Sequence, residues 1–326
     1  MPSYRTGTVT SILSERPGLQ RVEVDGERAY VITQVIGPVA VGDRVVMNTT
    51  AVELGLGTGG WHVVHWNLAR DAWSEPGAGH EMKLRYTSMQ VDAGVAPPPE
   101  PGEWQNRLDP PVVACFLHSQ VAVVAAAFKH VAPGRSLGYV MTDGGALPLA
   151  FSDLVARLRD DGLLDVTVSA GQAFGGEREA VNVHHALELC ADQHAVVVGM
   201  GPGSLGTGTE FGFSGMEVAA VLEAAEAMSF QPVVALRVSG ADPRERHQGV
   251  SHHARTVLDV TTARAVVPIP RGEPRPDVGD HDVVEVDVPE LGDLDVTSMG
   301  RTRNEDPAFF AYAAAAGVYA ANALLD

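Results

Sequence analysis

Ionisable side chains gather directly after short apolar runs in the C-terminal two thirds of the chain. His118 follows the first of these runs, and Asp143 follows the second within a Thr-Asp-Gly-Gly sequence. Arg244, Arg246 and His247 come shortly after the fifth run. In an open parallel sheet, ligands bind beyond the carboxyl ends of the strands, near the point where the strand order reverses. We therefore expect these side chains to lie at one edge of a sheet, around a ligand.

The loop after the fourth apolar run has the most distinctive composition. It reads GMGPGSLGTGTE from Gly199 to Glu210, with glycines in a G-x-G-x-x-G spacing. Glycines let backbone amides turn towards an anion at the start of a helix. The loop therefore predicts a site for a small anion. The residues expected to contact it are Gly201, Gly203, Ser204, Gly206, Thr207, Gly208 and Thr209.

The same loop matches a dinucleotide-binding fingerprint poorly. It follows the fourth strand instead of the first, and Pro202 lacks the amide hydrogen that a phosphate would need. No Asp or Glu stands about twenty residues further on at the end of the next strand, where the nearest candidate is Asp242, and the sequence holds no Walker A motif. An anion-binding loop and a purely structural turn both stay open, and no particular cofactor is predicted.

Histidines are the main candidates for acid–base chemistry. His247 stands five and six residues before the pair His252-His253, which follows the candidate N-cap Ser251. A helix N-terminus favours the neutral imidazole, which can accept a proton or donate a hydrogen bond. The predicted catalytic residues are His118, Asp143, His247 and His252. Arg244 and Arg246 are predicted to clamp a carboxylate or phosphate, or else to form surface ion pairs.

A metal centre is the alternative use of the same histidines. Its ligands would be His247, one of His252 or His253, and His118 or Asp143. Adjacent helical residues point about 100° apart, so a neighbouring pair chelates one metal with difficulty, and no metal ligand is assigned. The other pair, His184-His185, lies within a predicted helix and is interpreted as structural.

Composition and charge restrict the class of protein. Of 326 residues, 45% are apolar and 20% are charged, which is typical of a globular protein. The net charge of −18 argues against nucleic-acid binding. Cys115 and Cys190 lie within apolar runs, so we expect buried, unreactive thiols and no disulfide.

No secretory or membrane segment is predicted. The N-terminal residues lack an apolar core of a signal peptide, which favours a cytoplasmic location. Residues 308–325 carry no charge, but half of them are alanine, so we expect a packed terminal helix instead of a membrane span. The aromatic residues of this helix could also form the face of a homodimer.

The N-terminal part of the chain reads as a small β module. Runs rich in β-branched residues predict strands over residues 8–13, 20–24, 27–33, 44–48 and 62–67, with Asp25-Gly26 as a hairpin turn. Such short strands are typical of an SH3- or OB-type barrel. Residues 83–91 predict one more strand or a connector. Four prolines within residues 95–102 mark a linker, which gives domains of residues 1–100 and 101–326.

From Pro111 onward, apolar runs alternate with helical patterns. Strands are predicted over residues 112–117, 137–141, 164–169, 195–200, 232–238 and 265–268, with an edge strand over 283–288. Helices are predicted over residues 119–131, 149–160, 178–193, 214–229, 251–263 and 306–325. Continuous apolar strands separated by helices indicate a parallel sheet buried on both faces. The predicted fold is thus a doubly wound, mostly parallel, Rossmann-like α/β domain preceded by the β-barrel module.

Four stretches carry a family resemblance. They are GHEMKLRYTSMQ (79–90), GPGSLGTGTEFGFSG (201–215), DPRERHQGVSHHA (242–254) and MGRTRNEDPAFF (299–310). Together they resemble a bacterial family known as a domain of unknown function, over nearly the whole chain. The resemblance implies a cytoplasmic bacterial protein and carries no activity or ligand with it.

The residues themselves favour one function and leave two others open. The first is an enzyme acting on a small anionic metabolite, phosphorylated or nucleotide-like, at the carboxyl ends of the strands. The second is a ligand sensor or assembly protein without catalysis, with the barrel as a docking module. The third is a metal-dependent hydrolase built on the histidines.

Overall fold

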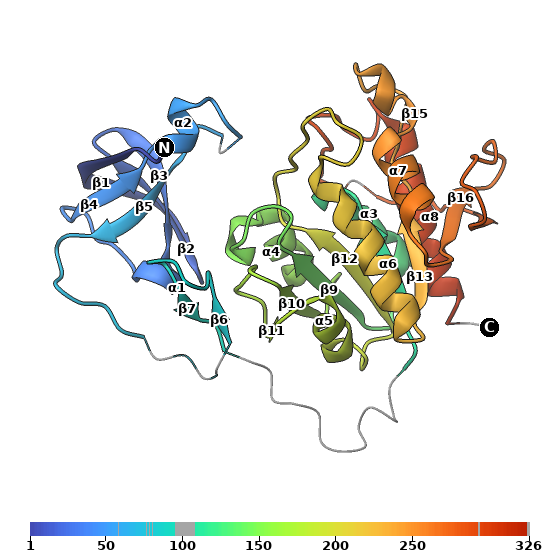
Figure 1. Ribbon diagram of the computed structural model, residues 1–326, viewed down its shortest axis with the longest axis horizontal. Coiled ribbons are helices and arrows are strands. Elements are labelled where there is room, and N and C mark those ends of the chain that lie inside the picture. Colours follow the sequence, from blue (N-terminus) through green and yellow to red (C-terminus); the bar gives the residue numbers. More distant parts are fainter. Residues whose placement is uncertain are drawn as a thin grey trace. The chain divides into compact units, whose positions relative to one another are not determined.

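The computed structural model describes residues 1–57, 59–75, 77, 79, 81–94, 108–292 and 294–324. The chain divides into two compact units, residues 1–94 and residues 95–326 (Figure 1). Each unit has a hydrophobic core of its own. The predicted proline-rich linker, residues 95–102, lies outside the described residues.

The first unit is a closed five-stranded barrel, as the sequence predicts. Its strands are β1 (Tyr4–Arg16), β2 (Leu19–Val24), β3 (Glu27–Ile32), β4 (Arg44–Asn48) and β5 (His62–Asn67), closed in the order β1-β2-β3-β5-β4. Short helices α1 (Thr33–Ile36) and α2 (Thr50–Glu53) follow β3 and β4. Asp25 and Gly26 have φ angles of 50° and 84°, which the tight turn between β2 and β3 requires. Inward-facing valines such as Val22 and Val45 fill the barrel.

Of the two alternatives for residues 83–91, one more strand or a connector, the single strand is wrong. The chain instead forms two short strands, β6 (Met82–Lys83) and β7 (Val91–Asp92), which pair antiparallel. Leu84 and Tyr86 take φ angles of 52° and 60°, a left-handed conformation that a strand cannot accommodate. The chain therefore turns back between the two strands.

The second unit contains an eight-stranded sheet in which every strand pair is parallel. Its strands are β8 (Pro111–Cys115), β9 (Leu137–Thr142), β10 (Val166–Ala170), β11 (Arg178–Ala180), β12 (Ala195–Met200), β13 (Gln231–Ala235), β16 (Val266–Pro270) and β17 (Asp282–Val286). They are ordered β11-β10-β9-β12-β8-β13-β16-β17. All residues of β8, β9, β10 and β12 are buried, because helices cover both faces of the sheet. The Rossmann-like prediction is confirmed.

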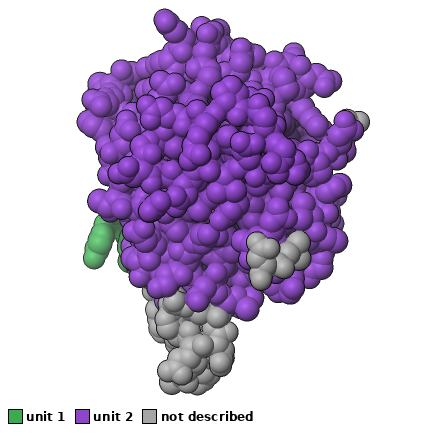
Figure 2. All heavy atoms as spheres, turned by 90° about the vertical axis from the view of Figure 1, so that its right-hand side faces the viewer, with its two compact units in different colours: residues 1–94 green, residues 95–326 purple. Residues whose placement is uncertain are grey.

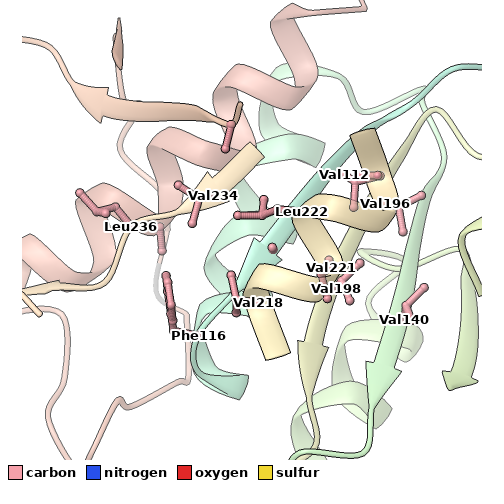
Figure 3. Packing of buried hydrophobic residues seen from close by; sticks show 14 of the residues in the cluster. Val112, Phe116, Val140, Val196, Val198, Val218, Val221, Leu222, Val234 and Leu236 are labelled. Carbon is pink, nitrogen blue, oxygen red and sulfur yellow. The ribbon is translucent and has the colours of Figure 1, made fainter. Parts of the chain in front are cut away.

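Helices cover the two faces in the way that a doubly wound chain requires. On one face lie α3 (His118–Val131), α4 (Asp153–Asp160) and α8 (Pro307–Asn322); on the other lie α5 (Val183–Leu189), α6 (Glu217–Ala227) and α7 (His252–Val260). Figure 3 shows Val218, Val221 and Leu222 of α6 packed towards valines of β8, β12 and β13. Figure 2 shows the surface of this unit from the side on which β16 lies in Figure 1.

Short elements connect the main ones. The 3₁₀ turns η2 (Leu149–Phe151), η3 (Ser214–Met216) and η4 (Glu245–His247) precede α4, α6 and α7. Strands β14 (Val238–Ser239) and β15 (Gly249–Val250) pair antiparallel on either side of η4. None of the helices in the described part of the chain is long and apolar enough to cross a membrane.

The helix predicted over residues 178–193 is wrong at its start. Residues 178–180 form β11, which pairs with β10 at the edge of the sheet. The helix α5 begins only at Val183, because the Asn182 side chain accepts a hydrogen bond from the backbone amide of His185 at 3.0 Å. The N-cap asparagine was the sequence signal that marked this boundary.

Candidate functional site

The strand order reverses between β8 and β12. After β8 the chain crosses β12 to reach β9 and continues towards β11, whereas after β12 it crosses β8 to reach β13 and continues towards β17. The loops that leave β8 and β12 therefore run in opposite directions from neighbouring strands. Between such loops an open α/β sheet forms its ligand crevice.

A cavity of about 460 Å³ lies at this reversal point. Residues 117–119, which follow β8, and residues 200–204, at the end of β12 and in the loop after it, form much of its lining. Leu154 and Arg157 of α4 and residues 295–299 complete it. Its volume is in the range of small-molecule sites, which is about 300–1,000 Å³. The cavity therefore combines the position and the size expected of a ligand site.

The amino end of α3 reaches this cavity. The first amides of a helix have no partner within the helix and carry partial positive charge. Gln120, which is fully buried, fixes this end: its Oε1 accepts from the amides of Phe116 and Leu117 at 2.9 and 3.1 Å, and its Nε2 donates to the carbonyl of Ala235 at 2.8 Å. Sequence reasoning missed Gln120, although a buried polar residue in the first turn of a helix suggests such a role.

His118 lies in the lining of the cavity, and hydrogen bonds hold its ring on both sides. Nδ1 is 2.9 Å from the carbonyl oxygen of Met200, so it carries the proton and donates. Nε2 accepts from the hydroxyl of Ser152 at 2.6 Å. Burial lowers the pKa of His118, so the ring stays neutral. Ser152 is itself buried and caps α4, so this chain of bonds ties the ends of β12, α3 and α4 together.

The first glycines of the loop after β12 allow two loops to pack against each other. A Cβ on Gly201 would overlap the carbonyl oxygen of Ala146, and a Cβ on Gly145 would overlap that of Gly201. The amide of Ala146 also donates to the carbonyl of Pro202 at 2.9 Å. Of the predicted anion-binding residues, Gly201, Gly203 and Ser204 line the cavity.

The second half of the same loop projects away as an exposed hairpin. The amide of Thr207 donates to the carbonyl of Gly212 at 2.7 Å, and that of Ser214 donates to Leu205 at 2.9 Å. Helix α6 begins only at Glu217, so these glycines do not lead directly into a helix. The structure places Gly206, Thr207, Gly208 and Thr209 on this hairpin, outside the lining of the cavity.

Glu217, the first residue of α6, is an acidic group that sequence reasoning missed. Its Oε1 accepts from the hydroxyl of Thr142 at 2.5 Å. Burial, aided by the nearby carboxylate of Asp143, raises the pKa of Glu217 to about 7 against the opposing effect of the Thr142 bond. Asp143 accepts a hydrogen bond from the amide of Gln172 at 2.9 Å. The sequence signal that could have identified Glu217 was an acidic residue in the first turn of the helix after the glycine-rich loop.

The two predicted arginine clamps have different surroundings. Arg244 donates from Nε and Nη2 to the buried carboxylate of Asp242 at 2.9 and 2.8 Å, which holds the pKa of Asp242 well below its usual range. Arg244 is therefore engaged in a bidentate ion pair. Arg246 is exposed, and its Nη1 would lie 3.6 Å from a Cβ on Gly208, which places it beside the hairpin.

Three of the predicted histidines form a cluster of their own. His247, His252 and His253 each offer a ring nitrogen, and these atoms lie within 4.8 Å of one another. The ring of His253 also stacks on Phe213, with a centroid distance of 3.7 Å and an interplanar angle of 6°. Phe213 closes the hairpin after β12, so the cluster and the hairpin are in contact.

Comparison with known proteins agrees with the motifs. Residues 28–317 match the model of a family described as protein of unknown function (DUF3866). The chain belongs to this family. The family resemblance seen in the sequence is confirmed, and the matched residues include most of both units. No curated protein matches the sequence.

In this DUF3866 protein the predicted site residues fall into three groups. His118, Gly201, Gly203 and Ser204 line the cavity at the reversal point. Asp143 lies beside Glu217 at the end of β9. His247 and His252 join His253 in the histidine cluster, with Arg244 and Arg246 around them. The structure gives His118 and Asp143 partners outside the histidine cluster.

Proposed function

We propose that the second unit binds a small anionic metabolite, phosphorylated or nucleotide-like, in the cavity between the ends of β8 and β12. The observation that carries the proposal is that this cavity, at the reversal of strand order, receives the amino end of α3. Ser119 on α3 and Ser204 on the opposite loop add hydroxyl groups to the lining. Backbone amides and hydroxyls of this kind are suited to phosphate or carboxylate oxygens.

Arg157 supplies the cationic side chain of the lining. Its guanidinium pairs with the carboxylate of Asp295, which also lines the cavity. The Asp295 side chain is almost fully exposed, at 95%, so its ion pair with Arg157 is a weak one. A bound phosphate would compete with Asp295 for Arg157 and would place its charge opposite the amides of α3.

The proposal has two forms, an enzyme that converts its ligand and a sensor that only binds it. As an enzyme it would use the ring of His118 at the edge of the cavity, after one ring nitrogen exchanges its bond to Met200 or Ser152 for the ligand, whereas as a sensor it would bind the metabolite unchanged. We favour the enzyme, since an ionisable side chain lies in the lining of the cavity at the reversal of the strand order, where an open α/β sheet binds its ligand. A cytoplasmic location fits the two unpaired, buried cysteines.

The test is a thermal-shift screen of the purified protein against nucleotides, sugar phosphates and inorganic phosphate, followed by calorimetric titration of the best compound. A ligand at about a hundred times its dissociation constant adds about 2.7 kcal/mol of stability, which corresponds to a shift of several degrees. We expect a phosphorylated compound to produce such a shift. If none of these anions stabilises the folded protein, the proposal is wrong.

The variant Ser119→Asp locates the site. A carboxylate at the second position of α3 is favourable to the helix but repels an anion in the cavity, so the fold is kept and binding is lost. The matched control is His184→Asp, which puts the same carboxylate at the second position of α5 on an exposed residue. If both variants bind the anion with equal affinity, the anion binds elsewhere on the protein.

A further inference from the structure

Three histidine rings meet at the start of α7. His247 comes from η4, while His252 and His253 are the first two residues of α7. Ring centroids of His247 lie 4.8 Å from those of both His252 and His253, which are 4.2 Å from each other. Helical side chains tilt towards the helix N-terminus, so a pair in the first turn can bend over the end of the helix. The ring nitrogens of this adjacent pair therefore come within 4.8 Å of each other and of His247, although neighbouring helical residues point about 100° apart.

Hydrogen bonds select which nitrogen of His252 is free. Its Nδ1 is 3.3 Å from the carbonyl oxygen of Arg246, and a carbonyl oxygen can only accept. The proton therefore lies on Nδ1, and Nε2 presents a lone pair. A backbone carbonyl that binds the second nitrogen is the usual support of a metal-ligating histidine.

His247 has a buried nitrogen that lacks a partner. The residue is 1% exposed, and its Nδ1 is 2.7 Å from the hydroxyl of Ser251. Its Nε2 has no hydrogen-bond partner among the residues that the structure describes. A buried polar atom without a partner costs free energy, which a metal ion at Nε2 would offset.

The three rings are neutral in the folded protein. Burial, together with neighbouring arginines such as Arg237, lowers the pKa of His247 to about 4. Burial likewise lowers the pKa of His253 to about 3, and that of His252 is lowered in the same direction. Neutral imidazole is the form that coordinates a metal, but the Nε2 proton of His253 still has to move, and the arginines that lower these pKa values also oppose a bound cation.

We propose that His247, His252 and His253 form a binding site for a divalent transition-metal ion such as Zn²⁺. Imidazole is a preferred ligand of zinc, and three protein ligands leave a fourth coordination position for water or a substrate atom. The histidine cluster is separate from the anion cavity in its residues, so this inference does not rest on the proposed function.

Arg237 is the group that the metal must displace. Its Nη1 lies 3.1 Å from Nδ1 of His253 and donates to it, which leaves the ring proton on Nε2. The guanidinium also lies 3.9 Å from the buried carboxylate of Asp242. For Nε2 of His253 to coordinate, the proton has to move to Nδ1 and Arg237 has to turn towards Asp242. Asp242 and Asp306 offset part of the positive charge of the arginines around the cluster.

The test is a titration of the full chain, freed of metal with a chelator, with Zn²⁺ by calorimetry and with Co²⁺ by visible absorption. We expect one Zn²⁺ per chain and the strong ligand-field absorption of four-coordinate Co²⁺. His252→Ala should weaken Zn²⁺ binding by more than the roughly 10–100-fold that loss of an outer partner costs. The control is His184→Ala, which removes the exposed histidine of the other adjacent pair and should change nothing.

A second variant guards against misfolding. His252→Cys keeps a ligand at the same position, so it should restore Co²⁺ binding and add a thiolate-to-cobalt charge-transfer band that the parent lacks. The metal-free parent and each variant are compared by urea unfolding to establish that they are folded. A folded parent that binds no stoichiometric Zn²⁺, or binding that is equal in the parent and in His252→Ala, would overturn the proposal.

Discussion

Replacing Glu217 with glutamine should remove a specific part of the pH dependence of stability. Glu217 is half-buried at the start of α6, where its carboxylate accepts from the hydroxyl of Thr142 and lies near Asp143. Burial raises the pKa of Glu217 from 4.5 to about 7. The folded protein therefore holds this proton more tightly than the unfolded chain does.

The direction of the effect follows from proton linkage. Between about pH 4.5 and pH 7 the folded state binds more protons than the unfolded state at this residue, so the free energy of unfolding falls as the pH rises. The stabilisation is complete below pH 4.5 and is lost as the pH passes 7. At about 1.4 kcal/mol per pKa unit, the rise in pKa corresponds to about 3 kcal/mol, an upper limit for a half-buried group.

The assay is urea unfolding of the parent and of Glu217→Gln from pH 4.5 to pH 8. Buried histidines such as His118 have lowered pKa values, so their contribution to the free energy of unfolding is lost as the pH falls. The profile of the parent protein therefore combines this loss at low pH with the loss from Glu217 at high pH. The difference in the free energy of unfolding between the variant and the parent isolates the contribution of Glu217. As the pH rises, the variant should become more stable relative to the parent by up to about 3 kcal/mol.

The control is Glu210→Gln, the same change at an exposed position of the hairpin, for which the difference should stay flat. A flat difference for Glu217→Gln as well, within about 0.5 kcal/mol, would show that the carboxylate is solvated in the folded protein. The burial of Glu217 beside Thr142 would then be refuted as the source of a raised pKa.

Two further predictions concern the core. Gly317→Ala should destabilise the protein by about 1–3 kcal/mol, because a Cβ there would overlap the carbonyl oxygen of Val124 and force α3 away from α8. Urea unfolding measures this change in stability. If the variant is instead more stable by about 1 kcal/mol, as helix propensity alone would make it, then α3 and α8 do not cross closely at Gly317. Cys115 and Cys190 are fully buried, which raises the pKa of both thiols, that of Cys190 to about 12. A thiol reagent should therefore label neither cysteine in the native protein and both in urea; rapid labelling of the native protein would contradict their burial.

The sequence by itself determined the elements and the edge of the sheet at which polar residues gather. Continuous apolar runs such as residues 195–200 predicted strands buried on both faces, because burial on two sides removes the alternation of polar and apolar residues. Asp25-Gly26 predicted its turn because few residues adopt positive φ angles easily. These features depend on neighbours in the sequence, so the sequence displays them directly.

Only the tertiary structure decided which of the loops meet. The pairing of β12 with β8 brings residues 117–119 and 200–204 around one cavity, while the rest of the glycine-rich loop folds onto itself as a hairpin. The bending of His252 and His253 over the end of α7 joined them to His247, and the buried Asp242 engaged Arg244. Strand order and these contacts join residues far apart in the chain, and their energies depend on packing in three dimensions, which no local pattern of residue types records.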